Sequence, residues 1–244
     1  MNFKLAMILV FGLSPLQTWA RSNKSVGKDQ VALIELYTSE SCSSCPPADK
    51  WISNLIEQPG LWSKFVPVVF HVDYWNHLNW KDRLSTSKAS ERQRRIAQTW
   101  SHPSVYTPGL VLNGKEYREW RRQKFPSILS QSSQVSLQLT ILRPNEVRLT
   151  WEGLSKGDVF TMNYALLGFG LKTDVKSGEN SGKRLVHDFA VLNWDQKELD
   201  NSKKSSLYQV PIIKNAPTKL GLAVWIERKG SPIPIQAAGS FLSN

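Results

Sequence analysis

Two patterns of hydrophobic and polar residues divide the chain near residue 133. Before that point, apolar runs typical of buried strands alternate with segments whose apolar residues recur at helical spacing. The predicted strands lie at 31–39, 65–75 and 110–117, and the predicted helices at 48–58, at about 87–100 and at about 121–131. Asn113-Gly114 splits the last strand segment into a hairpin. The element order is therefore β-α-β-α-β-β-α.

After residue 133 the chain changes to short runs in which apolar and polar residues alternate, as in strands with one buried face. The runs lie at 135–141, 147–151, 159–167, 183–192, 207–213, 220–226 and 233–241. Such a series of short strands separated by turn residues favours an antiparallel sandwich. We predict an α/β plus all-β protein, with a thioredoxin-like domain at 28–132 followed by an antiparallel β-sandwich-like domain at 133–244.

Residues 1–20 have the features of a secretory signal peptide. Lys4 gives a positive start, residues 5–13 are apolar, and Thr18-Trp19-Ala20 places small residues where a signal peptidase cleaves. The apolar run is too short for a membrane anchor, and no later segment is long and apolar enough to span a bilayer. We therefore expect a periplasmic or secreted protein with no stable membrane span.

The formal net charge is +11 at pH 7, which raises the question of an anionic partner. The densest basic cluster comprises Lys81, Arg83, Lys88, Arg92, Arg94 and Arg95. Elsewhere Lys and Arg are spread along the chain, and no basic repeat is interleaved with aromatic residues. We interpret the cluster as a solvated helical face and predict no nucleic-acid partner.

The only two cysteines, Cys42 and Cys45, form a C-x-x-C pair between the first predicted strand and the first predicted helix. Such a pair can close into a disulfide and reopen, because the second thiol reaches any mixed disulfide on the first. A helix start lowers a thiol pKa, although Pro46-Pro47 shift the expected helix start past Cys45. An inert disulfide and a metal site are the alternatives. The first would constrain little chain, and two thiolates supply only half of a tetrahedral zinc site.

We assign Cys42 as the attacking thiol and Cys45 as the more buried, resolving thiol. Pro108 precedes a strand at the point in the element order where thioredoxin-like proteins keep a cis proline, so we predict a cis Thr107-Pro108 bond beside the cysteines. A cis bond there would leave backbone groups free for a substrate strand and keep metal away from the sulfurs. An ordinary trans bond is the alternative.

His71 and Asp73 alternate onto one face at the end of the second strand, on the sheet edge that also carries the cysteine turn. Together with Thr107 they are candidates for tuning the thiols or moving a proton, and ordinary capping of the next turn is the simpler interpretation. The alternative chemistry is a copper site with Cys42, Cys45 and His71 as ligands, since thiolates and imidazole suit copper. The redox chemistry itself needs no cofactor.

Two further features lie outside this set. Residues 177–188 form a polar loop that is either a hairpin connection or a way to present Glu179, Asn180 and His187 to a partner. Trp75 and Trp80 are candidates for an apolar substrate platform near the cysteines.

Four motifs stand together along the chain, at 35–50 around the cysteines, 70–75, 105–108 and 178–180. With them the chain resembles the secreted thioredoxin-like family called domain of unknown function 1223, over nearly the whole mature length. The resemblance implies a thioredoxin-like domain and export, mostly in bacteria, and no established activity. Compared with the best-known thioredoxins, Ser41 replaces Trp before the first cysteine, Ser43-Ser44 replaces Gly-Pro between the cysteines, and Pro46-Pro47 is added.

The sequence therefore predicts an exported thiol–disulfide oxidoreductase that uses the C-x-x-C pair on protein substrates. The expected partner is a protein thiol or disulfide. The alternative is a non-catalytic copper carrier or a partner-binding module, so the sequence alone leaves open whether the protein is an enzyme.

Overall fold

The structure is a computed structural model that describes residues 22–24, 29–122, 132–200 and 202–242. The predicted signal peptide at 1–20 lies outside the described residues. So does most of the helix predicted at 121–131, where the described part ends in a 3₁₀ helix, η2 (Glu119–Arg122).

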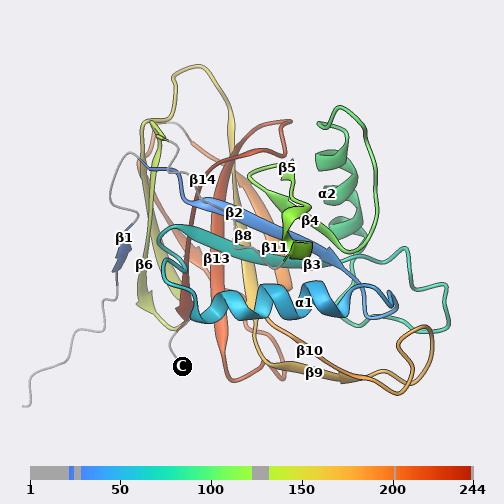
Figure 1. Cartoon of the computed structure of the whole chain (residues 1–244). Coiled ribbons are helices and arrows are strands. Elements are labelled where there is room, and N and C mark those ends of the chain that lie inside the picture. The colour runs from blue at the N-terminus through green and yellow to red at the C-terminus, as the bar shows by residue number, and fades with distance from the viewer. Residues whose placement is uncertain (1–21, 25–28, 123–131, 201, 243–244) are drawn as a thin grey trace, which may run out of the picture.

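One mixed sheet of eight strands dominates the fold, in the order β14-β13-β8-β11-β3-β2-β4-β5 (Figure 1). Its first-half strands are β2 (Ala32–Thr38), β3 (Phe65–His71), β4 (Gly109–Leu112) and β5 (Lys115–Glu116). Its second-half strands are β8 (Phe160–Gly168), β11 (Ala190–Glu198), β13 (Leu220–Arg228) and β14 (Pro234–Leu242). The sheet therefore draws strands from both sides of residue 133.

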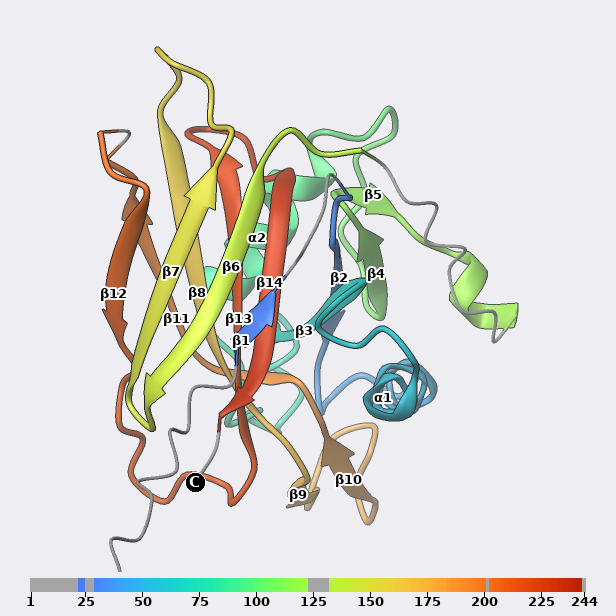
Figure 2. The same cartoon turned by 90° about the vertical axis from the view of Figure 1, so that its left-hand side faces the viewer.

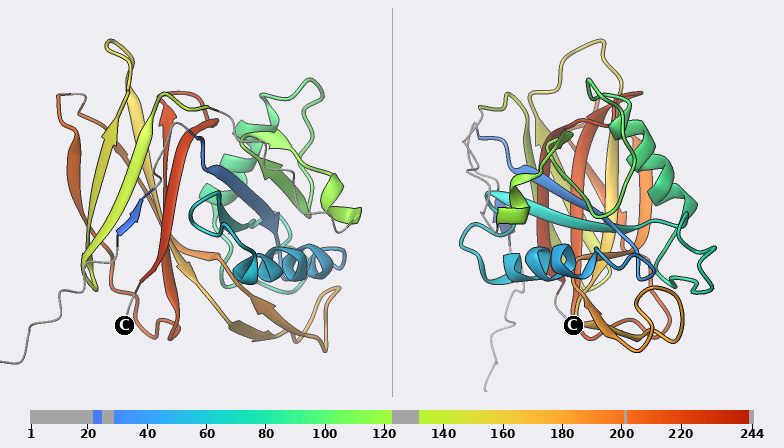
Figure 3. Two further views of the ribbon diagram at one scale, coloured as in Figure 1. Left: turned by 60° about the vertical axis from the view of Figure 1, so that its left-hand side comes forward. Right: turned by 45° about the vertical axis from the view of Figure 1, so that its right-hand side comes forward.

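Two smaller sheets complete the strands of the described residues. A four-stranded sheet has the order β1 (Ser22–Lys24), β6 (Ser136–Arg143), β7 (Glu146–Glu152) and β12 (Ser205–Gln209). β9 (Leu171–Asp174) and β10 (Arg184–His187) form a separate two-stranded hairpin. In the views of Figures 2 and 3, the four-stranded sheet lies on the far side of β8, β13 and β14 from helix α1 (Pro46–Ser53).

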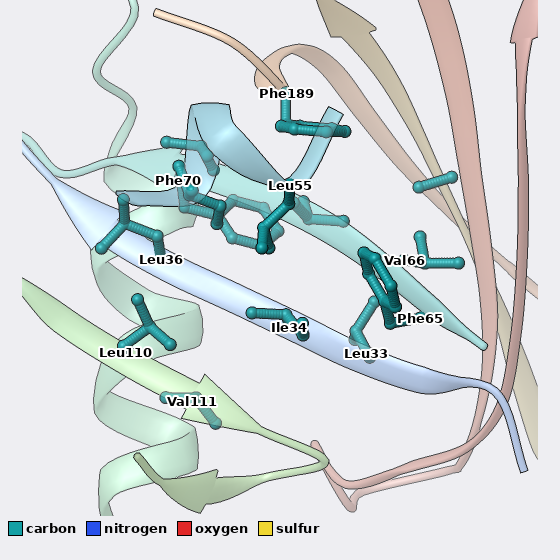
Figure 4. Close-up of a cluster of buried hydrophobic side chains, with 14 of the residues drawn as sticks. Leu33, Ile34, Leu36, Leu55, Phe65, Val66, Phe70, Leu110, Val111 and Phe189 are labelled. Carbon is teal, nitrogen blue, oxygen red and sulfur yellow. The ribbon is translucent and has the colours of Figure 1, made fainter. Parts of the chain in front are cut away.

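Two helices cover the first-half strands. α1 follows β2 directly and continues into a 3₁₀ turn, η1 (Asn54–Glu57). α2 (Ser87–Ala97) begins at Thr86, whose side chain accepts a hydrogen bond from the Ala89 N–H, a common way to satisfy a helix start. β2 and β3 are buried on both faces, as their continuous apolar runs predict. Figure 4 shows part of this core around β2, β3 and β4, including Leu36, Phe65 and Phe70.

The predicted assembly, a thioredoxin-like α/β domain followed by a β-sandwich-like domain, is wrong. Most of the local elements form close to where the sequence predicts them, but β3-β2-β4-β5 is not a sheet of its own. β11 pairs in parallel with β3, with Ala190 opposite Val69, and the Val69 N–H donates to the Phe189 carbonyl at 2.9 Å. This pairing merges the two halves into a mostly β structure with two short α-helices in its described part.

The merged sheet is held by two hydrophobic clusters. The first joins α1, α2, β2, β3 and β4 to side chains of the second half such as Phe189 and Trp225. The second fills the space between the four-stranded sheet and β8, β13 and β14, with Leu149 and Leu222 fully buried. Because the first cluster needs residues from both halves, the two predicted units share one core.

Candidate functional site

Cys42 and Cys45 form a disulfide at the turn from β2 to α1, with their Cα atoms 5.4 Å apart. Cys45 is the residue that caps α1, so the helix begins after the second cysteine, as the two prolines predict. The cysteines are 1% and 0% exposed, whereas Ser43 and Ser44 between them are exposed. The Cys42 sulfur lies 3.4 Å from the Ser44 hydroxyl oxygen.

The start of α1 offers few donors to a thiolate. Pro46 and Pro47 occupy its first two positions and have no N–H. The next two N–H groups, of Ala48 and Asp49, both donate to the Cys45 carbonyl, at 2.9 and 3.1 Å. The helix dipole remains, but the direct N–H contacts that usually accompany it are absent from this part of the described chain.

The loop between β9 and β10 holds the cysteine turn in place. The buried Asn180 side chain donates to the carbonyls of Glu40 and Cys42, both at 2.9 Å. Its neighbour Glu179 accepts the Ser43 N–H at 3.0 Å. Residues 177–188 are thus the loop and second strand of a hairpin, as one interpretation of the sequence has it, and they also contact the disulfide turn. In Figure 1 the hairpin runs below α1.

Five buried titratable side chains gather beside this turn, under α1. The His71 Nδ1 atom lies 2.7 Å from an Asp82 carboxylate oxygen, and the Asp82 carboxylate also accepts the Glu40 N–H at 2.9 Å. His187 Nε2 lies 3.4 Å from a Glu40 carboxylate oxygen, and the two imidazole rings meet edge to face at 4.8 Å. Asp49 is the fifth member and is 7% exposed.

The proton affinities of this cluster are shifted in opposite directions. Burial alone would lower the pKa of His71, but the Asp82 carboxylate outweighs it and raises that pKa. Burial would likewise raise the pKa values of Asp82 and Glu40, but His71 lowers the first and the nearby His187 imidazole lowers the second. Burial does raise the pKa of Asp49. The cluster therefore combines groups that hold a proton with groups that release one.

Asp49 is the member of the cluster that lies on α1, the helix that Cys45 caps. It lies four residues after Cys45, and Cys45 already has helical backbone angles. Side chains four residues apart share a face of a helix, with Cβ atoms about 5–6 Å apart. Both residues are buried, so the carboxyl and the sulfur lie on the same buried face of α1.

The structure brings only some of the predicted site residues together. The Thr107-Pro108 peptide bond is cis, as predicted. Gly109 pairs with Tyr37, which places Pro108 at the end of β2 that leads into the cysteine turn. Thr107 accepts a hydrogen bond from the Trp75 indole at 2.7 Å.

Asp73 lies apart from the buried cluster. Its carboxylate accepts the Ser90 hydroxyl and its N–H donates to the same oxygen at 3.1 Å, which fastens the segment after β3 to α2. The Asp73 side chain therefore makes a structural contact with α2, and its role in tuning the thiols stays a prediction. Trp80, a candidate for an apolar substrate platform, is instead bonded to the buried cluster. Its indole N–H donates to the Glu40 carboxylate at 2.8 Å.

Among the described residues, no three or more His, Cys, Asp or Glu side chains are placed to hold a metal ion. The sulfurs of Cys42 and Cys45 are joined to each other, so the predicted copper set lacks its two thiolates while the disulfide is closed. Asp82 contacts the Nδ1 atom of His71 and leaves Nε2 without a hydrogen-bond partner in the described chain. In the same part of the chain, no helix has the length and apolar character to cross a membrane.

Sequence reasoning missed Glu40, Asp49, Asp82 and the contacts of Asn180. Asp49 had a usable signal, because it stands four residues after a cysteine on a predicted helix. Asp82 had none, since a carboxylate among lysines and arginines reads as an exposed group. The partner of Asn180 lies about 140 residues away, at Cys42, and no local pattern indicates such a contact.

A model of the family described as "Protein of unknown function (DUF1223)" matches residues 33–227. Among curated proteins, none matches the chain. A crystal structure of protein AGR_C_4864 from Agrobacterium tumefaciens is similar with a TM-score of 0.60 and 21% identity, covering 88% of this chain and 95% of that one. HBP35 of Porphyromonas gingivalis is similar with a TM-score of 0.57 and 13% identity, covering 88% and 76%. At these identities the likeness concerns the fold alone.

Proposed function

This chain belongs to the DUF1223 family, whose function is unknown, and from its site we propose that it is a thiol–disulfide oxidoreductase acting on protein substrates through Cys42 and Cys45. The observation that carries the proposal is the disulfide between the only two cysteines, set at a strand–helix turn beside buried proton-binding groups. The signal-like sequence at 1–20 supports an exported site of action.

The position of the disulfide favours exchange over a purely structural role. Its cysteines are three positions apart in sequence, so closing the loop removes little entropy from the unfolded chain. The protein also has two large hydrophobic clusters, so its core does not need a structural disulfide for stability. The exposed Ser43 and Ser44 place this turn where another protein can reach it.

The exchange proceeds in two balanced steps. A thiolate of the partner attacks the Cys42 sulfur, the bond to Cys45 breaks, and Cys45 leaves as a thiolate that takes up a proton. The partner's second thiolate then attacks its own sulfur in the mixed disulfide, and Cys42 leaves and is protonated. The partner has lost two electrons and two protons, and the protein now holds a dithiol. The forward sequence thus transfers the disulfide to the partner. In the reverse sequence the Cys42 thiolate attacks a partner disulfide, Cys45 resolves the mixed disulfide, and the partner is released as a dithiol.

The surrounding side chains have distinct roles in this scheme. Asn180 and Glu179 hold the backbone of the turn, so that the sulfurs keep a fixed direction. The titratable cluster provides buried proton donors and acceptors close to the two thiols that form. Cys42 remains our attacking thiol in the reductive direction, because its sulfur lies 3.4 Å from the hydroxyl oxygen of the exposed Ser44.

Two assays test the proposal. The wild type should catalyse reduction of the insulin disulfides by dithiothreitol, and Cys42→Ser should not. Cys45→Ser should accumulate a mixed disulfide with its partner in cells that express it, because the resolving thiol is gone. Insulin reduction that survives Cys42→Ser, or the absence of any trapped partner with a well-folded Cys45→Ser protein, would count against exchange at this pair.

A further inference from the structure

The β9–β10 hairpin and the segment 76–86 form one surface next to the disulfide. The Arg83 guanidinium donates to the Thr173 hydroxyl and to the Lys172 carbonyl, both at 3.3 Å. The Ser177 hydroxyl donates to the Asn79 carbonyl, and the loop continues into Glu179 and its contact with the cysteine turn. A partner that approaches the disulfide from this side meets the hairpin first.

This surface carries an excess of positive charge. Its exposed cations are Lys81, Arg83, Lys172, Lys176, Lys183 and Arg184. Its exposed carboxylates are Asp174 and Glu179. Asp174 is paired with Arg184 at 2.6 Å, and the six cations outnumber the two carboxylates on this surface. An excess of one sign of charge attracts a partner of the opposite sign and raises the rate at which they meet.

The outer face of the hairpin is suited to a polypeptide. Lys172, Asp174 and Lys176 alternate to the solvent side while Thr173 and Val175 point inward. Val186, directly opposite Lys172 in the hairpin, is 45% exposed and adds an apolar contact between the charges. Charged groups around an apolar side chain are a common arrangement in transient interfaces.

The contact of Glu179 with Ser43 shows that the cysteine turn can bind a carboxylate. The Glu179 carboxylate is exposed, yet it takes the N–H of Ser43 between the two cysteines. Hydrogen bonds from the Ser43 side chain and backbone lower the pKa of Glu179. The turn thus already binds a carboxylate, and the bond is exposed enough to be exchanged for one from another molecule.

We propose that the partner of this disulfide is an acidic polypeptide that docks on the basic hairpin and replaces Glu179 with one of its own carboxylates at the Ser43 N–H. The inference rests on the proposed exchange function and adds its substrate class. Displacement of Glu179 loosens the loop whose next residue, Asn180, holds the Cys42 carbonyl. Recognition of charge and access to the buried sulfur are therefore coupled.

The test uses two synthetic dithiol peptides with the same C-x-x-C core, one flanked by glutamates and one by lysines, and dithiothreitol as a neutral reductant. The rate constant for reduction of the oxidised protein is measured by stopping the reaction at set times with an alkylating agent. Mass spectrometry then gives the fraction of protein whose thiols are alkylated. We expect the acidic peptide to react at least about tenfold faster at low salt, and this advantage to shrink strongly in about 0.5 M salt.

Matched charge reversals locate the effect. Lys172→Glu with Lys176→Glu should remove most of the preference for the acidic peptide and leave the rate with dithiothreitol unchanged. Arg148→Glu with Lys156→Glu makes the same charge change at exposed positions on β7 and the turn after it, away from the hairpin, and should preserve the preference. Glu179→Gln should speed the acidic peptide further.

The outcomes separate the two proposals. Equal rates for the two peptides, or equal loss in both charge-reversed proteins, would overturn the acidic partner and leave exchange intact. Hairpin-dependent binding to phosphatidylglycerol vesicles without any peptide preference would overturn it in favour of a lipid surface. If dithiothreitol and both peptides all fail to reduce the folded protein, the exchange function itself falls.

Discussion

The two faces of β2 and β3 both bury charged side chains, and they hold them in different ways. On the α2 face, Arg92 is bonded to Glu35 at 2.6 Å and to Glu227 at 2.8 Å. The rings of Trp194 and Trp225 lie 5.4 and 5.0 Å from its guanidinium carbon. This network ties α2 to strands from both halves of the chain.

On the α1 face, buried charge is held by histidines and carboxyls. His71 and Asp82 form the closest pair, with Glu40, His187 and Asp49 around them. Burial alone would lower the pKa of Arg92, but Glu227 and Glu35 raise it well above its usual value, so Arg92 keeps its charge at every ordinary pH. The α1 cluster contains groups that titrate. The Arg92 cation on the α2 face therefore stays charged, whereas side chains on the α1 face, beside the disulfide, can take up and release protons.

The largest effect on stability should come from removing the cation of the Arg92 network. Arg92→Met leaves Glu35 and Glu227 buried without a cation, so we expect a loss of about 3–5 kcal/mol in the free energy of unfolding. Urea titration measures this loss. Lys88→Met on the exposed face of the same helix should change stability by less than about 0.5 kcal/mol. A loss below about 1 kcal/mol for Arg92→Met would show that the network does not join the halves.

The next effect concerns the hairpin that holds the disulfide turn. Asn180→Ala leaves the carbonyls of Glu40 and Cys42 without their donor, which should cost about 1–3 kcal/mol and speed reduction of the disulfide by dithiothreitol. Ser181→Ala is the control, because that hydroxyl donates to the Lys176 carbonyl within the same loop. If both variants react at the wild-type rate, the hairpin does not restrict the disulfide.

The titratable face should make stability depend on pH. His71 has a raised pKa in the folded protein, so its contribution is fully present below the unfolded value of about 6.5 and is lost as pH rises through the folded value. The raised pKa of Asp49 has the same sign, but its effect begins at a lower pH, above the unfolded value of about 3.9. We therefore expect the free energy of unfolding to decline as pH rises above about 6.5.

Urea titrations between pH 6 and pH 9 measure that decline. His71→Gln should flatten it, because the variant has no imidazole to lose a proton. Lowered pKa values at Asp82 and Glu40 predict a separate loss of stability in acid, below about pH 4.5. An unchanged slope above pH 6 in His71→Gln would mean that His71 does not hold its proton through Asp82.

The smallest effect tests the proline-rich helix start. Pro47→Ala restores an N–H at the second helical position, from which it can reach the side chain of the capping residue, Cys45. In a Cys42→Ser background, this should lower the pKa of the Cys45 thiol by about one unit, as followed by thiolate absorbance. Ser44→Ala in the same background serves as the control. An unchanged pKa would mean that the added N–H stays bonded elsewhere.

Local patterns predicted much of this molecule. The apolar runs located β2 and β3, Asn113-Gly114 located the hairpin of β4 and β5, and the double proline placed the start of α1 after Cys45. The cis bond at Pro108 followed from its place in the element order. Apart from the cis bond, each of these depends on residues close together in sequence.

The assembly depended on contacts that no local pattern records. Alternation shows which face of a strand is buried, but it does not show which strand lies beside it, so the pairing of β11 with β3 was missed. One predicted strand, 183–192, is in fact two, because the chain bends between β10 and β11 at Phe189, whose φ is 55°. Arg92 was read as solvated because it stands among other basic residues, and its partners lie on distant strands.

The most direct test is redox equilibration of the folded protein. It is incubated in a series of glutathione buffers, thiols are trapped by alkylation, and the masses of the zero, singly and doubly alkylated forms are recorded. The account predicts a reversible transition in which Cys42 and Cys45 gain or lose two electrons together while the fold persists. A disulfide that stays oxidised across the series and is reduced only after unfolding would contradict it.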